Sequence, residues 1–144
     1  MATLGNKRKC YVGVTSSSST TYTLLTGETS NNITLNNTLV DISDKAAEYQ
    51  KFIGGIKGGT GSASVHADDT DTQQKALLDS LEAGGEVPIF IGELGSSSSA
   101  LTGSKGFAFM AIINSISETN DNGSVSTRDF SFTISGPWTH YPTA

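Results

Sequence analysis

Histidine and cysteine, the side chains that most often bind zinc, are few in this chain and far apart. His66, His140 and Cys10 have no second His, Cys or paired carboxylate at ligand spacing. Because zinc needs three or four such ligands, these residues predict neither a metal centre nor a bound cofactor. No serine occupies a G-x-S-x-G motif, which would present an activated nucleophile. We therefore predict that the protein is not an enzyme.

Two further segments resemble binding loops only in composition. The acidic run Asp68-Asp69-Thr70-Asp71 lacks the calcium-loop pattern, because the sixth and twelfth positions counted from Asp69 are Gln74 and Ser80 rather than Gly and Glu. The run Gly58-Gly59-Thr60-Gly61-Ser62 is not followed by the Gly-Lys-Ser/Thr of a phosphate loop. We interpret the first as helix capping and the second as a hinge or a site of close backbone packing.

Composition favours a folded, β-rich chain of one domain. The 144 residues are 35% hydrophobic and 16% charged, and Ser and Thr make up about a quarter of them. The net charge of −5 argues against stable nucleic-acid binding, which depends on cations that neutralise phosphates. No apolar segment follows the basic residues 7–9, so we expect neither a signal peptide nor a membrane span, and we expect synthesis in a cytosol.

The hydrophobic pattern predicts one helix among short strands. The segment Thr70-Asp71-Thr72-Gln73 fits a capping box, and Gly84–Gly85 supplies a stop, so we expect a helix over residues 71–83. Its apolar stripe should face the sheet through Leu77, Leu78 and Leu81. We expect strands at residues 10–15, 22–25, 33–42, 57–67, 87–92, 107–117 and 125–135. This predicts a mainly β sandwich or barrel-like fold with one flanking helix and long loops.

The last predicted strand alternates most clearly. Phe130, Phe132 and Ile134 should face the core, while the opposite face carries Asp129, Ser131, Thr133 and Ser135. We expect Gly136–Pro137 to end the strand and residues 136–144 to form a C-terminal tail. At the other end, residues 1–9 are expected to form an N-terminal arm.

Residues 41–57 are predicted to be a long loop with one helical turn at most. The segment from Asp44 to Ile53 has weak helical spacing, and the aromatic residues Tyr49 and Phe52 have no obvious place in their own core. We therefore interpret Asp44, Tyr49, Phe52 and Ile53 as contacts between subunits.

Three motifs in order resemble the major tail tube proteins of long-tailed bacteriophages, in particular the TP901-1-type major tail proteins. They are "VDIS-D" with the following acidic and aromatic loop, residues 40–55; "DDTD-QQ-ALL" and "AGG-VPIFI" within residues 58–91; and "RDFSFTISGPW", residues 128–138. The resemblance spans residues 39–138 and leaves out the serine runs at 16–19 and 96–99.

This resemblance implies a structural virion protein. Such subunits form hexameric rings that stack into a hollow tube, which DNA crosses on its way into the host. It also implies tape measure, tail terminator and distal tail proteins as partners, assembly in the bacterial cytoplasm, and no membrane. Asp129, Ser131 and Thr133 would then face the lumen or a neighbouring subunit. The alternative is a β-sandwich binding module, such as a carbohydrate- or receptor-binding virion domain, which would require clustered exposed aromatic residues.

Overall fold

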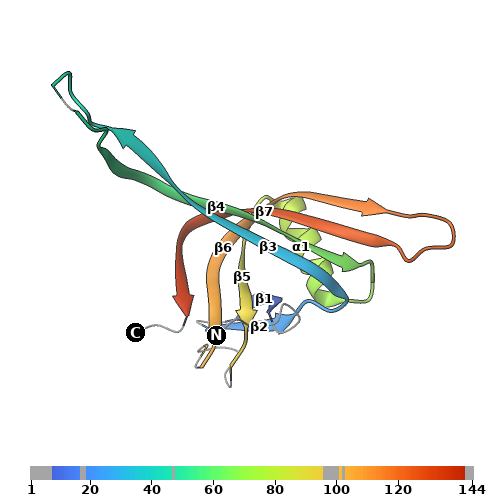
Figure 1. Ribbon diagram of the computed structural model, residues 1–144. Helices are drawn as coiled ribbons and strands as arrows, with labels where there is room; N and C mark the ends of the chain where they lie inside the picture. The colour runs from blue at the N-terminus through green and yellow to red at the C-terminus, as the bar shows by residue number, and fades with distance from the viewer. Residues whose placement is uncertain (1–7, 17–18, 47, 96–100, 102, 142–144) are drawn as a thin grey trace.

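The protein forms one seven-stranded antiparallel sheet and one helix in the computed structural model, which describes residues 8–16, 19–46, 48–95, 101 and 103–141 (Figure 1). In chain order the elements are β1 (Lys9–Ser16), β2 (Ser19–Leu24), β3 (Glu28–Asp41), β4 (Phe52–His66), α1 (Thr72–Ala83), β5 (Glu86–Glu93), β6 (Lys105–Thr119) and β7 (Thr127–Tyr141). The strand order is β2-β1-β5-β6-β7-β4-β3. The predicted mainly β fold with one helix is confirmed. The serine run 96–99, residues 1–7 of the expected N-terminal arm and residues 142–144 of the expected tail lie outside the described residues.

The sheet curves so that one face encloses the core. A long upper layer consists of β3, β4, β7 and the C-terminal half of β6. Below this layer lie β1, β2 and β5 (Figure 1). Phe109 of β6 stacks on Phe132 of β7 at a ring distance of 5.6 Å. The predicted inward residues of β7 are all buried in this core, which also contains Cys10, Val12, Leu25, Ala63, Val65, Leu77, Val87, Ile89, Ile91, Ala111 and Ile113.

Helix α1 begins and ends close to the predicted residues. The side chain of Asp71 accepts a hydrogen bond from the Gln73 backbone N–H at 3.2 Å, so Asp71 is the N-cap, and Thr70 is not. Gly84 ends the helix in the left-handed conformation, with φ 73°. The predicted apolar stripe is partly wrong. Leu77 is 2% exposed and Leu81 packs against the core, but Leu78 is 40% exposed.

We expect Leu77→Ala to lower the free energy of unfolding by about 2–5 kcal/mol, because it removes buried methyl groups and leaves a cavity. Leu78→Ala on the same helix is the matched control, and its effect should stay below about 1 kcal/mol because Leu78 is largely exposed. Urea denaturation followed by circular dichroism measures both. Equal losses in the two variants would show that Leu77 does not anchor the helix.

Two strands run differently from the prediction because their neighbours override local signals. Gly136–Pro137 does not end β7, which continues to Tyr141 and pairs with β6 through Trp138–Phe109 and His140–Phe107. Gly136 takes φ 85°, beside an irregularity in the β6–β7 register. Pro88 is the third residue of an internal strand, and it lies just beyond the last β1–β5 pair, Val12–Ile89. The missing N–H of Pro88 therefore interrupts no pair between the described residues of β1 and β5.

β3 and β4 extend far beyond the rest of the sheet as a two-stranded arm, defined here as residues 36–58 (Figure 1). β4 pairs with β7 only from Thr60 to His66, so within the described residues the arm pairs with no third strand. β4 begins at Phe52, which means that residues 52–57 are strand and the predicted loop over 41–57 is too long. The register of the β3–β4 ladder shifts between Asn37 and Leu39, as at a β-bulge.

Candidate functional site

The face of the upper layer that points away from the core is almost entirely hydroxyl and amide. Strand register places its side chains in cross-strand rows, because directly opposed residues point to the same face of a sheet. The three rows are Ser30–Ser64–Asp129–Ser117, Asn32–Ser62–Ser131–Ser115 and Thr34–Thr60–Thr133–Ile112. We call these twelve residues the polar face. It includes the predicted Asp129, Ser131 and Thr133, so the predicted alternation of β7 is confirmed.

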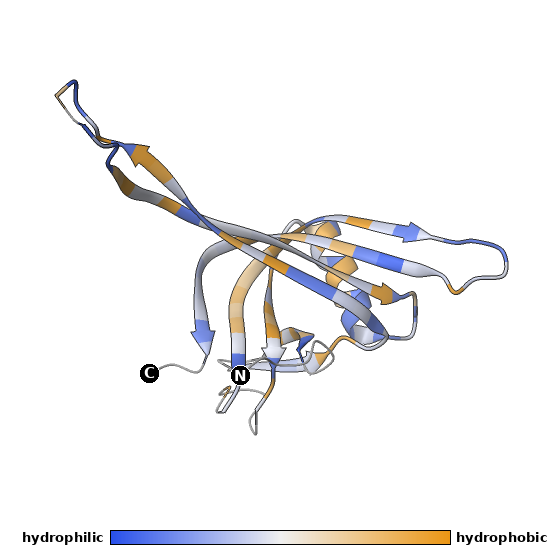
Figure 2. Ribbon diagram, in the orientation of Figure 1, coloured by the Kyte–Doolittle hydropathy of each residue, from blue (hydrophilic) through white to orange (hydrophobic). Residues whose placement is uncertain are grey.

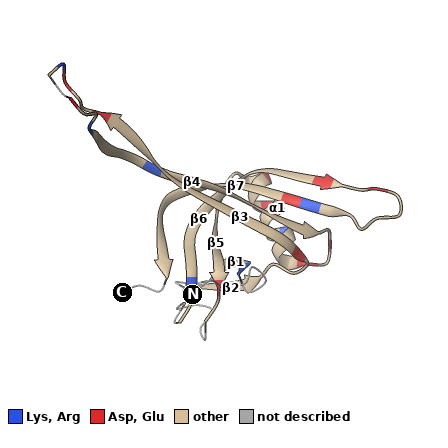
Figure 3. Ribbon diagram, in the orientation of Figure 1, with Lys and Arg blue, Asp and Glu red and all other residues tan. Residues whose placement is uncertain are grey.

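Asp129 is the only charged residue of the polar face. Its Oδ1 accepts a hydrogen bond from the Ser64 hydroxyl at 2.6 Å, which ties β7 to β4. β3 has no charged residue between Glu28 and Asp41, and the chain has none between Lys57 and Asp68. Figure 3 shows the resulting uncharged stretch along the middle of β3 and β4. A surface without Lys or Arg has no group that binds phosphate strongly.

The arm carries apolar residues, coloured orange in Figure 2, and the described part of the subunit leaves their side chains exposed. Strand register places Val40 opposite Ile53 on one face of the arm. Leu39 and Phe52 lie diagonally across the two strands on the other face. Successive residues of a strand point to opposite sides, so both faces of the ribbon are apolar. Ile56 is 85% exposed and Tyr49 at the tip is 82% exposed. Isolated two-stranded ribbons are marginally stable in water, so this arm is suited to contact a partner.

The tip of the arm is held by short-range hydrogen bonds. Asp41 Oδ1 accepts from the Ser43 N–H at 2.9 Å, and this bond holds the pKa of Asp41 below its usual range. Asp44 Oδ1 accepts from the Ala46 N–H at 3.0 Å, and Ser43 Oγ accepts from the Lys51 N–H at 2.6 Å. These bonds form turns, and no helical turn occurs in the described part of residues 42–51. The predicted contact residues Asp44, Tyr49, Phe52 and Ile53 therefore lie on this tip and on the first part of β4.

A buried amide and an arginine join the helix to the sheet, and sequence reasoning missed both. The side chain of Gln74 is buried. Its Oε1 accepts hydrogen bonds from the Asp68 N–H at 3.2 Å and from Arg128 Nη1 at 3.0 Å. Its Nε2 donates a hydrogen bond to the His66 carbonyl oxygen at 3.0 Å. Arg128 also bonds Asp69 and, at 2.6 Å, Glu118. These carboxylates, Asp69 first, raise the pKa of Arg128. The network fixes α1 over the ends of β4, β6 and β7.

Three tyrosines that are scattered in the sequence meet around Phe90. The Phe90 ring lies 6.0 Å from Tyr11 and 6.2 Å from both Tyr22 and Tyr141, and Phe90 itself is fully buried. Burial is the main cause that raises the pKa values of Tyr11 and Tyr22. The four aromatic rings therefore pack together as a second, smaller core around Phe90 of β5. This is not the exposed aromatic cluster that a carbohydrate-binding module requires.

Within the described residues, His, Cys, Asp and Glu side chains form no group of three that could hold a metal ion. No described helix has the length and apolar character needed to cross a membrane.

Similarity to known proteins lies in the fold and not in the sequence. No family model matches the chain, and no curated protein matches its sequence. Among solved structures, the tail of an empty gene transfer agent particle with C6 symmetry gives a TM-score of 0.78 at 16% identity, over 99% of this chain and 100% of that chain. The virion of a native gene transfer agent particle gives 0.75 at 14% identity, with the same coverage. The SPP1 tail tube gives 0.74 at 12% identity, over 92% of this chain and 76% of that chain. The chain therefore has the tail tube fold, and the resemblance inferred from the motifs is confirmed at that level.

Proposed function

We propose that this protein is a structural subunit that assembles into stacked hexameric rings, which form a hollow tail tube for the passage of DNA. The observation that carries the proposal is the likeness, over nearly the whole chain, to the tail of a particle with C6 symmetry. The exposed apolar arm and the polar face support it independently. A tube subunit needs surfaces for its own copies and a surface that DNA does not bind.

The polar face is suited to line the channel. DNA attracts cations, and each Lys or Arg on its path would hold a phosphate and release counterions. The polar face offers hydroxyl and amide groups and one carboxylate, Asp129, so phosphate contacts there are weak or repulsive. Asp129, Ser131 and Thr133 would face the lumen in this arrangement.

Open strand edges provide a way to close a ring. β3 is the last strand of the sheet, so within the described residues no strand pairs with the N–H and C=O groups of its outer edge. On the other side of the upper layer, β5 pairs with β6 only from Lys105 to Ile112, so among the described strands none pairs with residues 113–119 of β6 on that side. Pairing of β3 of one subunit with this part of β6 of the next would join the upper layers into a continuous barrel.

Finer assignments follow from the sequence motifs. We propose that the chain is a TP901-1-type major tail protein and that it assembles in a bacterial cytoplasm. Its partners would be the tape measure, tail terminator and distal tail proteins. The predicted contacts Asp44, Tyr49, Phe52 and Ile53 would touch a neighbouring subunit, as expected for an arm with no cover of its own.

Negative-stain electron microscopy of the purified protein tests the proposal. A tube subunit should form rings or tubes of uniform diameter, and the number of subunits in end-on class averages should be six. A protein that stays monomeric at all concentrations, while binding glycans on an array, would instead support a β-sandwich binding module.

Replacing Asp129 by Lys should leave assembly intact and slow DNA transit, because the new ammonium groups in the channel attract phosphate. Ejection in a complete particle, or retention of short DNA by purified tubes, measures the effect. Asp129→Asn removes the negative charge but keeps an oxygen that can accept from the Ser64 hydroxyl, and Asp121→Lys makes the same charge change as Asp129→Lys in the exposed β6–β7 turn. If Asp129→Lys and Asp121→Lys retain DNA equally, the polar face does not line the channel.

A further inference from the structure

One asparagine of this chain stands directly before a glycine. The chain has eight asparagines, and only Asn122 has glycine as its next residue. Asn122 and Gly123 form the exposed turn between β6 and β7 (Figure 1). Asparagine is a thermolabile residue, because the backbone nitrogen of the next residue can attack its side-chain amide. A glycine in that position has no Cβ atom to obstruct the attack.

The turn leaves the reacting groups of this pair open. The Ser124 N–H donates a hydrogen bond to the Asp121 carbonyl oxygen at 3.2 Å, so the turn closes around the Asn122–Gly123 peptide and not through it. Residues 120–126 belong to neither strand. A Cβ atom added to Gly123 would meet nothing within 4 Å, so the described chain leaves open space beside the attacking nitrogen.

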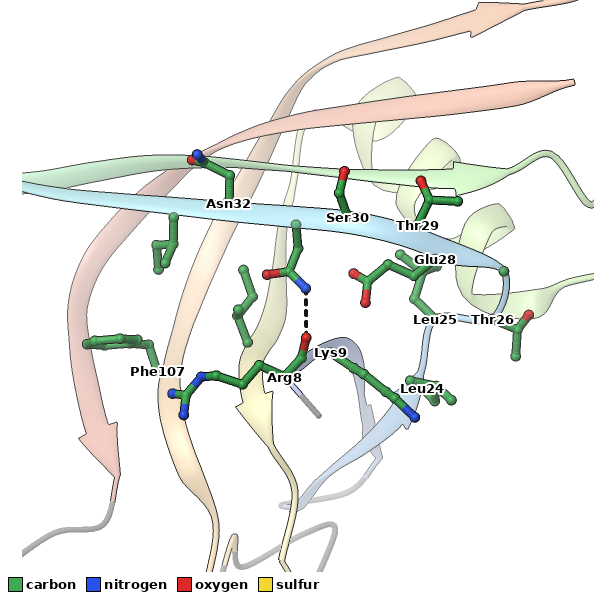
Figure 4. A pocket seen from close by; sticks show the side chains of 14 residues that line it. Arg8, Lys9, Leu24, Leu25, Thr26, Glu28, Thr29, Ser30, Asn32 and Phe107 are labelled. Carbon is green, nitrogen blue, oxygen red and sulfur yellow. Dashed lines mark hydrogen bonds between the residues drawn. The ribbon is translucent and has the colours of Figure 1, made fainter. Parts of the chain in front are cut away.

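The asparagines within strands are held by the sheet. Attack requires the next backbone nitrogen to turn toward the side chain, and a hydrogen-bonded ladder resists that rotation. The Asn31 side chain is held as well, because its Nδ2 donates to the Arg8 carbonyl oxygen at 3.1 Å, the dashed line at the pocket beneath the first part of β3 in Figure 4. The other asparagines within described strands are Asn32, Asn36, Asn37 and Asn114.

Asn120 provides a comparison in the same connection between β6 and β7. It is exposed like Asn122, but its Nδ2 donates a hydrogen bond to Glu118 Oε2 at 3.1 Å. Its next residue is Asp121, whose side chain obstructs the backbone nitrogen. The Asp121 carboxylate also disfavours the negative charge that this nitrogen develops as it attacks. Two exposed asparagines in one connection therefore differ in reactivity.

We propose that Asn122 is a site of spontaneous deamidation, which gives the protein a chemical record of its age. The Gly123 nitrogen forms a bond to the Asn122 side-chain carbon, and the proton of that nitrogen leaves with the amide group as ammonia. Water then opens the cyclic imide at either of its two carbonyl groups. One product is aspartate, and the other is isoaspartate, whose main chain is longer by one methylene. The reaction needs no reagent other than water, and it goes beyond the proposed function because it requires no assembly.

Either product adds one carboxylate at the end of the β6–β7 hairpin. The net charge of the subunit changes from −5 to −6, and the new charge lies next to Asp121. Residues 120–126 include no buried residue, so the fold should persist after the conversion. We therefore expect a protein that keeps its structure while it becomes more acidic with time.

Incubation of the purified protein at neutral pH tests the site. Peptide mapping by mass spectrometry should show conversion at Asn122 that increases with time and is much slower at Asn120. Isoelectric focusing should show a second, more acidic form in the same proportion, with an unchanged circular dichroism spectrum. Enzymatic methylation of isoaspartate should label the peptide that contains residue 122. Conversion at Asn122 that is no faster than at Asn120 would overturn the proposal.

Three variants separate the chemistry of this pair from general ageing of the protein. Asn122→Gln replaces the reacting amide with one that is a methylene farther from the backbone, and the acidic form should disappear. Gly123→Ala places a Cβ atom beside the attacking nitrogen and should slow the conversion about tenfold or more. Asn120→Gln is the matched control and should leave the rate unchanged. An acidic form that accumulates equally in Asn122→Gln would place the modification at another residue.

The same measurement on the urea-unfolded protein shows whether the fold leaves the site open. The unfolded chain gives the rate of an unrestrained Asn–Gly pair, and we expect the folded protein to convert Asn122 at a comparable rate, because exposed turns tolerate local rearrangement. If Asn122 converts in urea and stays intact in the folded protein, the turn protects it and the proposal is wrong.

Discussion

Deletion of residues 44–53 is expected to give a folded subunit that forms no tubes. The deletion removes the turn at the tip and the exposed Tyr49, Phe52 and Ile53. Leu39 and Gly54 are already a cross-strand pair, so residues 40–43 can close the shortened hairpin as a four-residue loop. No buried core residue is lost, so the circular dichroism spectrum and cooperative unfolding should be preserved. Sedimentation and negative-stain microscopy measure assembly.

A variant of full length separates the role of the apolar side chains from that of arm length. Tyr49→Ser/Phe52→Ser/Ile53→Ser keeps every backbone residue and should also fail to assemble, because the contact depends on buried apolar area. Tubes of normal yield from the deletion variant would remove the arm from the assembly interface. An insoluble deletion variant would leave the serine variant to decide the question.

Gly106→Ala is expected to destabilise the subunit by about 3 kcal/mol or more. Gly106 of β6 faces Gly92 of β5, and its φ is 148°, a conformation that side chains rarely adopt. A Cβ atom there would lie 2.2 Å from the Ile91 carbonyl oxygen and 2.7 Å from Gly92 Cα. These are backbone atoms of a buried strand, so they cannot move aside without breaking the β5–β6 ladder. Thermal or urea unfolding measures the loss.

Two other glycines provide graded controls for this prediction. Gly123 has φ 84° but open space around it, so Gly123→Ala should cost about 1–2 kcal/mol from backbone strain alone. Gly85 has neither a positive φ nor a close neighbour, so Gly85→Ala should change stability by less than about 0.5 kcal/mol. The expected order of destabilisation is Gly106, Gly123, Gly85. If Gly106→Ala is no worse than Gly123→Ala, the close approach of β5 and β6 does not exist.

Local signals predicted some elements well because those elements depend on neighbouring residues. The start and end of α1 follow from an acidic cap and a glycine stop, and both lie within one residue of the prediction. The alternation of β7 placed Phe130 and Phe132 in the core, since one face of the strand is buried along its length.

Other features depend on contacts between residues distant in the chain, and local patterns missed them. Gln74 and Arg128 are 54 residues apart, and their bond exists only because α1 packs over the end of the sheet. Pairing with β6 carries β7 past Gly136–Pro137, which local turn chemistry predicts as an end. Residues 41–57 of the arm are predicted as a loop because their apolar side chains have no place in the subunit's own core. In the structure, residues 52–57 belong to a strand that pairs with β3.

In the proposed tube, the scarcity of charge on the polar face would have a consequence for the speed at which DNA passes. Hydroxyl and amide groups hold ordered water, so DNA would slide over a water layer and exchange weak hydrogen bonds with it. Friction against cationic walls depends on counterion release and therefore changes steeply with salt. Along rows of Ser, Thr and Asn this source of drag is missing, so the drag of the wall on DNA should hardly vary with ionic strength.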